Sequence, residues 1–509
     1  MNYPVWYIPT VGGGALIAFI AIVHVFVSHF AVGGGAFLIA LEKKAYKEEN
    51  AEMLEIVKRF ARFFILLTMV FGSVTGVAIW FITALVNPGG ISLLIHNFVF
   101  GWAAEWVFFV MEIVAAFVYY YTFGKMDRKT HLKIGWIYFI AAWMSLFLIT
   151  GIIDFMLTPG KWLETHNFWH GFFNPSFIPS VGFRTFMSFL MAGVYGLFVL
   201  SFYKDGEAKE KFTRYSALWV VISLVLMIPF AFWYIHVLPQ HAKALVYGQS
   251  PTIARATVYF AVSFGAALLL GLIVFFKPKL NHKVVSVLIF IAGFVIIGAF
   301  EWTREAARRP YVINEVMYSN MILKSEVPVL QKEGFLKKAK WVTVRNITEE
   351  NKIQAGKEIF IHQCYACHTI DGFNNDIKVK AKAMSYTALI KYINKIHQIR
   401  YFMPPFAGNE EEAEALAAFI AGDLLGKEIK KPEQQTAVNG EILFEDNCSS
   451  CHEKEDMHDL IEDWDRTRIR KALDMLNKLN PEMPDYDGTP QEKDILADYL
   501  YKLAEGEDD

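Results

Sequence analysis

The sequence predicts an all-α protein, in which a polytopic transmembrane bundle of about eight helices is followed by two small helical domains. Long apolar runs recur up to about residue 305, and each holds the ~20 residues that a helix needs to cross the hydrocarbon core of a membrane. Beyond about residue 325 the chain is polar, rich in Lys and Glu, and free of such runs. Soluble buried helices give shorter apolar runs, so a large soluble helical core is the weaker interpretation of the first part.

The apolar runs divide the chain into a membrane part and a polar part. We expect a transmembrane domain at 1–325, a connector at 326–345, and small helical domains at 346–425 and 436–509. The spanning helices are expected at 12–41, 60–87, 97–123, 134–158, 183–203, 215–238, 256–276 and 284–305.

Loop charges predict the orientation of the bundle. The loops after the first, third, fifth and seventh spans carry 17 Lys and Arg residues, whereas the other loops carry 4. The positive-inside rule therefore places both termini outside. The N-terminal stretch MNYPVWYIPT has no basic region, so we expect an outward-facing start to a spanning helix rather than a cleavable signal. We expect a multi-pass protein of a bacterial-type cytoplasmic (inner) membrane, with both termini on the periplasmic side. The four basic residues assigned to the outer loops are Lys161, Arg184, Lys243 and Arg255.

Two copies of the motif C-x-x-C-H lie in the polar part, with their first cysteines 84 residues apart, and a Met-Pro step follows each copy. This motif attaches a c-type haem through two thioethers, with the His as proximal iron ligand, and a Met sulfur completes a low-spin iron of raised potential. A lone copy could be a dithiol or part of a zinc site, but the repeat favours two covalent haems c. Met475 competes with the second Met-Pro methionine as a sulfur ligand. The predicted residues are Cys364, Cys367, His368 and Met403 in the first copy and Cys448, Cys451, His452 and Met483 in the second.

Both segments resemble class I cytochromes c over about 70 residues each. That resemblance implies single-electron carriers with partly exposed haem edges. Haem c attachment takes place on the outer side of the membrane, where the loop charges independently place this region.

Ionisable residues also occur inside the predicted spans. The first span, AIVHVFVSHFAVGGGAFLIALE, contains His24 and His29, and the third, GWAAEWVFFVMEIVAAF, contains Glu105 and Glu112. The fourth contains Asp154 near its outer end. Such residues are costly in a membrane and usually functional. A single buried His is more often a hydrogen-bonded packing residue than a ligand. Glutamates seven residues apart share one helix face, where they form a proton path or pair with other helices.

Three stretches resemble subunit I of the cytochrome bd oxidases. HVFVSHFAVGGGAFLIALE is similar to that family's first helix, whose haem-ligating His precedes L-x-x-G-x-A-F-L-x-A-x-x-E, and this implies His24 as a ligand. FVME is similar to the family's F-F-L-E and implies Glu112 as a proton-path residue, while Glu105 lies one residue out of register with a second one. EAARRPY with VINEV after it is similar to E-Y-G-R-Q-P-W-x-I-x-E-V, which implies Glu305 as a haem ligand and Arg308 as a propionate partner.

The resemblance implies two non-covalent haems, b, d or one of each, held by His24 and Glu305. A carboxylate is a weak iron ligand, so it favours a high-spin iron that reacts with dioxygen. Arg304, Arg308 and Arg309 can pair with the haem propionates at the outer edge of the bilayer. The competing interpretation is a salt-bridged helix end, in which Glu305 pairs with Arg308 and Arg309.

The chain departs from this family where a low-spin haem b and a quinol site are expected. The matching stretch of the fifth span, GFRTFMSF, has no His, and that of the seventh, YFAVSFGA, has no Met. The outer loop between the sixth and seventh spans is only about 239–255, and Glu301 stands where the family has a Trp. The family's ninth helix is absent, and the haem c segments stand in its place. We expect the third, low-spin haem b to be missing or bound differently.

We therefore expect a membrane-bound terminal oxidoreductase, of the cytochrome bd type and dependent on cytochrome c. Electrons from a soluble cytochrome c or a membrane donor complex pass through two haems c to a membrane di-haem centre that reduces dioxygen to water. Protons reach it from the cytoplasm by way of Glu112 and Glu105. We expect a lipid bilayer around the bundle, a second membrane subunit or a homo-oligomer, and no nucleic-acid partner.

Three alternatives stay open. The same architecture could reduce nitric oxide or another small oxidant. A quinol-to-cytochrome electron-transfer protein would have no terminal reductase activity, and a plain membrane anchor for a dihaem cytochrome would have no inner redox site. The residues leave the roles of His29 and His236 unassigned.

Overall fold

The computed structural model describes residues 3–429, 439–449, 451–480, 483 and 485–505. The chain forms two compact units. The membrane unit comprises Leu16–Ala84 with Gly90–Asn314, and the polar unit comprises Met1–Ala15, Leu85–Gly89 and Glu315–Asp509. The predicted start of the last domain at 436 and its end at 509 lie outside the described residues.

Eight helices of the described chain are long and apolar enough to cross a membrane, which confirms the predicted all-α transmembrane bundle. Short helices and turns join them: α4 (Pro88–Asn97), α7 (Trp162–Thr165), α8 (Phe168–Phe172), α11 (Gln240–Ala244), η2 (Leu245–Gln249) and η3 (Pro278–Leu280). The spanning elements are α1 (Gly13–Lys47), α2 (Ala51–Ile65) continued through the π-turn η1 (Leu66–Gly72) into α3 (Ser73–Val86), α5 (Val99–Thr122), α6 (Arg128–Asp154), α9 (Phe177–Leu200), α10 (Glu207–Val237), α12 (Pro251–Phe276) and α13 (Lys283–Ala306).

The second span begins earlier than predicted because an amphipathic turn precedes its apolar run. Asn50 caps α2, since its side chain accepts a hydrogen bond from the Met53 amide at 3.0 Å. The first turns bury Met53 and Phe60, whereas Arg59 is exposed and pairs with Glu55 at 2.9 Å. Charged residues on the exposed face interrupt the apolar run without ending the helix.

One orientation residue was assigned wrongly. Arg184, counted above as an outer-loop residue, lies inside α9 and is only 2 % exposed. The apolar run of the fifth span begins only at Phe183, whereas the helix begins at Phe177, because Ser180 and Arg184 are polar residues inside it.

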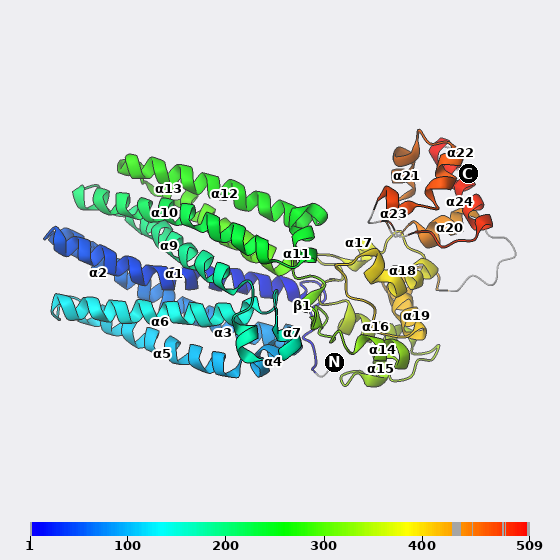
Figure 1. The fold of residues 1–509 in the computed structure, drawn as a ribbon, viewed down its shortest axis with the longest axis horizontal. Helices are drawn as coiled ribbons and strands as arrows, with labels where there is room; N and C mark the ends of the chain where they lie inside the picture. Colours follow the sequence, from blue (N-terminus) through cyan, green and yellow to red (C-terminus); the bar gives the residue numbers. More distant parts are fainter. Residues whose placement is uncertain (1–2, 430–438, 450, 481–482, 484, 506–509) are drawn as a thin grey trace. The chain divides into compact units, whose positions relative to one another are not determined.

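Helix α9 packs against α10 and α13, and α12 packs against α10 and α13 (Figure 1). Phe26 of α1 meets Phe290 of α13 with ring centroids 5.1 Å apart. A Cβ atom on Gly33 of α1 would lie 1.8 Å from the Ser188 carbonyl oxygen of α9, so only glycine permits this approach. Aromatic side chains fill the adjoining core, where Phe30 stacks on Tyr195 with ring centroids 4.0 Å apart. This packing fixes the faces of α1 and α9 that carry ionisable side chains.

The polar unit is helical, with a minor strand content around the connector. Two short strands follow α13: β1 (Tyr311–Ile313) is the last element of the membrane unit, and β2 (Met317–Tyr318) belongs to the polar unit. The helices after them are α14 (Val327–Glu333), α15 (Phe335–Lys338), α16 (Lys352–Gln363), α17 (Ile377–Lys380), α18 (Tyr386–Ile399), α19 (Glu410–Ala418) with η4 (Phe419–Leu424), α20 (Gly440–Asn447), α21 (Lys454–Ile461), α22 (Arg466–Ala472), α23 (Leu476–Leu479) and α24 (Pro490–Glu505).

The two C-x-x-C-H segments have the same local architecture. In each, a helix (α16 or α20) ends directly before the first cysteine and packs on a later helix (α19 or α24). A glycine eight residues before that cysteine makes the contact: a Cβ on Gly356 would lie 1.9 Å from the Ala415 oxygen, and one on Gly440 would lie 2.2 Å from the Tyr499 Cβ. Both segments thus have a glycine at the same distance before the first cysteine, and it makes the same helix contact, which supports the predicted internal repeat.

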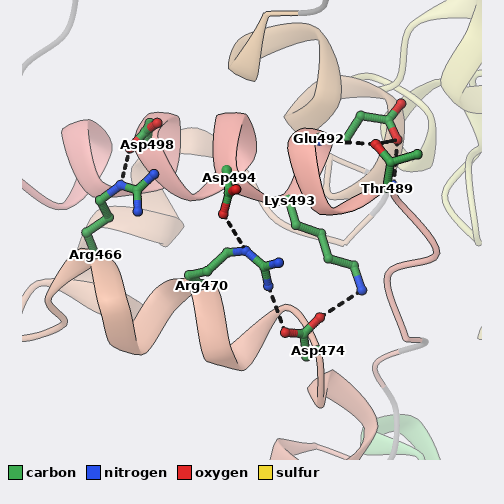
Figure 2. Close-up of polar contacts among 8 residues, drawn as sticks. All are labelled: Arg466, Arg470, Asp474, Thr489, Glu492, Lys493, Asp494 and Asp498. Carbon is green, nitrogen blue, oxygen red and sulfur yellow. Dashed lines mark hydrogen bonds and ion pairs between the residues drawn. The ribbon is translucent and has the colours of Figure 1, made fainter.

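Ion pairs join α22 and α24 on the surface of the second segment (Figure 2). Arg470 Nε lies 2.7 Å from Asp494, and its Nη1 lies 2.7 Å from Asp474, which also meets Lys493 Nζ at 2.8 Å. Exposed pairs of this kind contribute about 0–1 kcal/mol each. The fold of this segment therefore depends mainly on its buried apolar residues.

Candidate functional site

The first C-x-x-C-H motif forms one tight turn after α16. The Cys367 and His368 amides both donate to the Cys364 carbonyl, at 3.1 and 3.0 Å. Burial raises the pKa of the Cys364 thiol to about 12, so the unattached thiol is protonated at neutral pH. His368 Nδ1–H donates to the Asn375 carbonyl at 3.1 Å, which puts the lone pair of the ring on Nε2. Two thiols and a correctly protonated imidazole on one turn fit a covalently bound haem.

The second motif repeats this turn after α20. The Cys451 and His452 amides donate to the Cys448 carbonyl at 3.0 and 3.1 Å. Burial raises the pKa of the Cys448 thiol to about 12, and burial lowers the pKa of His452, which favours the neutral imidazole that iron binds. Met403 and Met483, the predicted sulfur ligands, are half-buried. These residues fit a second haem of the same kind.

Tyr365, inside the first motif, holds the N-terminal segment of the chain within the polar unit. Its hydroxyl accepts from the Ile8 amide at 2.8 Å and lies 3.1 Å from the Trp6 carbonyl. The Ile370 amide donates to the Pro9 carbonyl at 2.8 Å. The segment that leads directly into α1 is thus packed against the first C-x-x-C-H domain, which the sequence alone did not reveal.

His24 of α1 is oriented by a hydrogen bond that prepares it for metal ligation. Its Nδ1 lies 3.1 Å from the Thr75 hydroxyl of α3. That hydroxyl has one proton, which it donates to the carbonyls of Phe71 or Gly72 at 3.0 and 2.9 Å, so towards His24 it is an acceptor. Nδ1 therefore carries the ring proton and Nε2 the lone pair. A Cβ on Gly76 would lie 3.1 Å from the His24 Cε1, so glycine leaves room for the ring.

Glu305 lies at the end of α13 among three arginines. Its side chain is 53 % exposed and pairs through Oε1 with Arg308, which also donates to the Val312 carbonyl; its Oε2 lies 4.0 Å from Arg304 Nη2. Arg309 is half-buried one residue beyond. The helix-end salt bridge of the competing interpretation is therefore present with Arg308. It is compatible with a haem ligand, because the contact of Oε2 with Arg304 is longer than a hydrogen bond and leaves that oxygen able to bind a metal.

A buried ion-pair network occupies α9 and α13 where the sequence showed only missing haem ligands. Arg184 Nη1 lies 2.7 Å from Glu301 Oε1, and Arg304 Nε lies 2.9 Å from Glu301 Oε2. The side chains of Arg184 and Glu301 are 3 % and 8 % exposed. Asp154, fully buried, and His29 lie within electrostatic range of this network. The sequence signals were the density of charges at the end of the last span, the ionisable residues His29 and Asp154 inside spans, and Glu301 in place of a Trp.

Glu105 and Glu112 lie on one face of α5, as predicted, and each meets a hydroxyl of α6. Ser145 donates to Glu105 at 2.6 Å, and Tyr138 donates to Glu112 at 3.1 Å. Tyr138 also reaches the Ala31 carbonyl at 2.8 Å. Glu112 is 7 % exposed. His29 is buried with Nδ1 bonded to the Val25 carbonyl at 2.8 Å, and His236 is exposed.

Comparison with known proteins supports the two predicted resemblances, one for the membrane part and one for the polar part. Residues 15–249 match the family model of cytochrome bd terminal oxidase subunit I, and residues 351–420 and 435–500 match that of cytochrome c oxidase, cbb3-type, subunit III. Among solved structures, bd oxidase from Geobacillus thermodenitrificans is similar, with a TM-score of 0.53 at 16 % identity over 59 % of this chain and 88 % of that chain, which shows a shared fold. No curated protein matches the chain.

The charged end of α13 and the two C-x-x-C-H turns thus belong to one haem-dependent oxidoreductase of electron transport with several membrane-spanning helices. Residues 15–249 of its membrane half are similar to the cytochrome bd terminal oxidase subunit I family, and its C-terminal part is similar to cytochrome c domains.

Proposed function

We propose that the protein is a terminal oxidase that reduces dioxygen to water with electrons from a cytochrome c-level donor. The observation that carries the proposal is the combination, in one chain, of a bd-type bundle with two C-x-x-C-H domains and with Arg184 buried in α9. The α9 stretch that would supply a low-spin haem ligand instead supplies an arginine bound to Glu301 at 2.7 Å. Electrons therefore enter through the haem c domains rather than from quinol through a low-spin haem b.

Named residues hold each group in this proposal. Cys364, Cys367 and His368 with Met403, and their counterparts in the second motif, hold two covalent haems c. His24 and Glu305 hold two non-covalent haems, b, d or one of each, and these supply the iron that binds and reduces dioxygen. The Thr75 hydroxyl keeps the His24 lone pair on Nε2, and Arg308 orients the Glu305 carboxylate. Arg304 and Arg309 add positive charge for propionates.

Protein side chains deliver the protons that oxygen reduction consumes. Glu105 and Glu112 lie on one face of α5 and meet hydroxyls of α6 at 2.6 and 3.1 Å. Carboxyl groups with hydroxyl partners inside a membrane span are suited to pass protons. The loops that carry most of the basic residues lie in the cytoplasm of a bacterial-type cell, so both termini are periplasmic and protons enter from the cytoplasmic end. A soluble cytochrome c or a membrane donor complex, and a second membrane subunit or a second copy, are the proposed partners.

The alternatives differ in the oxidant or in the direction of electron flow. Nitric oxide fits the same open iron, and turnover with each oxidant separates the two. A quinol-to-cytochrome electron-transfer protein needs a low-spin haem b site. The buried Arg184–Glu301 pair in α9 and α13 argues against it.

Haem content tests the proposal. A pyridine haemochrome spectrum of the purified protein is expected to show two haems c and two non-covalent haems per chain. Glu305→Gln is expected to remove one high-spin haem and the reaction with dioxygen, while both haems c remain. Glu333→Gln is the matched control, because Glu333 is an exposed glutamate paired with Lys338 at 2.7 Å. Full haem content and full turnover in Glu305→Gln would assign Glu305 to the helix-end salt bridge alone.

A further inference from the structure

Helices α5 and α6 are antiparallel neighbours that form three polar contacts at regular intervals (Figure 1). Glu105 meets Ser145, and Glu112 meets Tyr138. Seven residues further along each helix, the Tyr119 carbonyl of α5 meets His131 of α6 at 2.8 Å. Seven residues are nearly two helical turns, so the three levels lie about 10 Å apart along the bundle. The third level lies near the joined ends of α5 and α6, where the loop carries Lys125 and the first turns of α6 carry Arg128, Lys129 and Lys133.

At this third level a glutamate and a histidine hold one proton between them. His131 Nδ1 lies 2.7 Å from Glu42 Oε1 of α1, and Nε2 lies 2.8 Å from the Tyr119 carbonyl. A carbonyl only accepts, so Nε2 carries a proton. The short Nδ1–Oε1 contact then needs a second proton, on the imidazole or on the carboxyl group. Both side chains are buried, at 1 % and 0 % exposure, so the proton is shared within the pair.

The surroundings connect this pair to the end of the bundle. The Tyr119 hydroxyl donates to Glu42 Oε2 at 2.7 Å. Half-buried Tyr46 lies within electrostatic range of Glu42, and the Arg128 guanidinium lies 4.7 Å from the Tyr46 ring centroid. The rings of Tyr119 and Phe123 pack on His131 with centroids 4.3 and 5.0 Å away. Tyr46 is thus the polar side chain that lies between the buried Glu42–His131 pair and the end of the bundle.

A small cavity lies on the inward side of the pair. It has a volume of about 10 Å³, and its lining is apolar: it consists of Gly35, Leu38, Ala61, Phe64, Ile65, Ala116, Tyr119, Gly135 and Tyr138. This is close to the room that the centre of one water molecule needs, but the apolar lining holds no water molecule in place. Because Tyr119 belongs to the third level and Tyr138 to the second, a water molecule that crosses the cavity in transit joins the two levels. Side chains on Gly35 or Gly135 would fill it, since their Cβ atoms would lie 2.4 Å from Tyr138 and 2.8 Å from Ile39.

We infer that the Glu42–His131 pair is the proton-loading site of the membrane domain. In each step the pair passes its proton through a water molecule in the cavity and the Tyr138 hydroxyl to Glu112, and it takes up another proton from the solvent side past Tyr46. Four such protons, with four electrons, convert one dioxygen to two water molecules. The inference rests on the proposed oxidase function, and it assigns Glu42, His131 and Tyr119 as proton-handling residues that touch no haem.

Proton uptake during a single turnover of the fully reduced enzyme tests this inference. Glu42→Gln is expected to slow uptake, followed with a pH indicator dye, by at least about tenfold, because an amide cannot hold the shared proton. Haem content and electron transfer from the haems c are expected to stay at wild-type values. Glu55→Gln, an exposed glutamate of α2 paired with Arg59 at 2.9 Å, is the matched control.

Tyr119→Phe is the second variant, because it removes one hydroxyl and keeps the ring that packs on His131. If Glu42→Gln loses haem, slowed uptake in Tyr119→Phe supports the loading site. Uptake at the wild-type rate in Glu42→Gln with normal haem content, or in Tyr119→Phe, overturns it. A wild-type protein that reacts with no oxidant at all overturns the oxidase function instead, so the two failures are distinguishable.

Discussion

Arg184 and Glu301 show how strongly a single buried pair can constrain the bundle. Glu301 binds Arg184 at 2.7 Å and Arg304 at 2.9 Å. Removal of one partner leaves an uncompensated buried charge, which costs about 3–5 kcal/mol, whereas apolar replacement of both partners costs much less. Glu301→Leu is therefore expected to lower the thermal stability of the detergent-solubilised protein far more than the double variant Arg184→Met, Glu301→Leu.

Thermal unfolding of the wild type and both variants measures this difference. A single variant that is as stable as the double variant would show that the charges of Arg184 and Arg304 reach water or another partner.

Thr75 is predicted to act on the haem site through His24. Thr75→Val removes the acceptor of the His24 Nδ1–H bond and keeps the side-chain shape. Loss of a residue that hydrogen-bonds a metal-ligating histidine typically lowers metal affinity or activity about 10–100-fold. We expect less non-covalent haem or slower oxygen consumption, with both haems c unchanged.

Thr68→Val is the matched control for Thr75→Val. Thr68 is also buried, and its hydroxyl bonds only to the Phe64 carbonyl of its own helix, at 2.8 Å. Equal effects of the two substitutions on haem content or oxygen consumption would contradict the prediction. They would mean that loss of any buried threonine hydroxyl in this part of the bundle has the same effect as loss of the bond to His24.

At the scale of elements, Glu412 joins α19 to the connector. Its carboxylate accepts from the amides of Phe335 and Leu336, both at 2.7 Å, and from the Asn409 amide at 3.1 Å, while it is 3 % exposed. Glu412→Ala leaves these buried amides without an acceptor, at about 1–3 kcal/mol per unsatisfied group. We expect faster hydrogen exchange of the amides in 334–339.

Hydrogen–deuterium exchange of full-length protein checks this prediction. The neighbouring Glu411 is exposed, so Glu411→Ala should leave exchange in 334–339 unchanged. Equal exchange in the two variants would remove Glu412 from its predicted role as a link between connector and haem c domain.

Helices and turns that depend on neighbouring residues in the sequence were predictable. Contacts between residues far apart in the sequence were not. Apolar runs predicted all eight spanning helices, and the C-x-x-C-H spacing predicted the two matching turns. The start of α2 was missed because its first turns have a charged face. Arg184 was placed in a loop because its partner, Glu301, lies 117 positions further along the chain. The contact between Glu42 and His131, which are 89 residues apart, was not predicted.

At the scale of the whole molecule, two functions are joined in one chain. The haem c domains suit electron entry, and the bd-type bundle suits oxygen reduction. Tyr365 holds the segment that becomes α1, the helix of His24, against the first haem c domain. In the proposed function, the direct electron donor acts at the haem c domains, and quinol is not that donor.

Steady-state oxygen consumption by the purified protein tests this central claim most directly. Reduced small cytochrome c, or an artificial donor that acts at the haem c level, is expected to drive rapid oxygen consumption, and quinol is expected to drive none above background. Met403→Ala or Met483→Ala should slow the donor-driven rate, because loss of a sulfur ligand shifts a haem potential. Rapid quinol-driven oxygen consumption, unaffected by either Met substitution, would contradict the account.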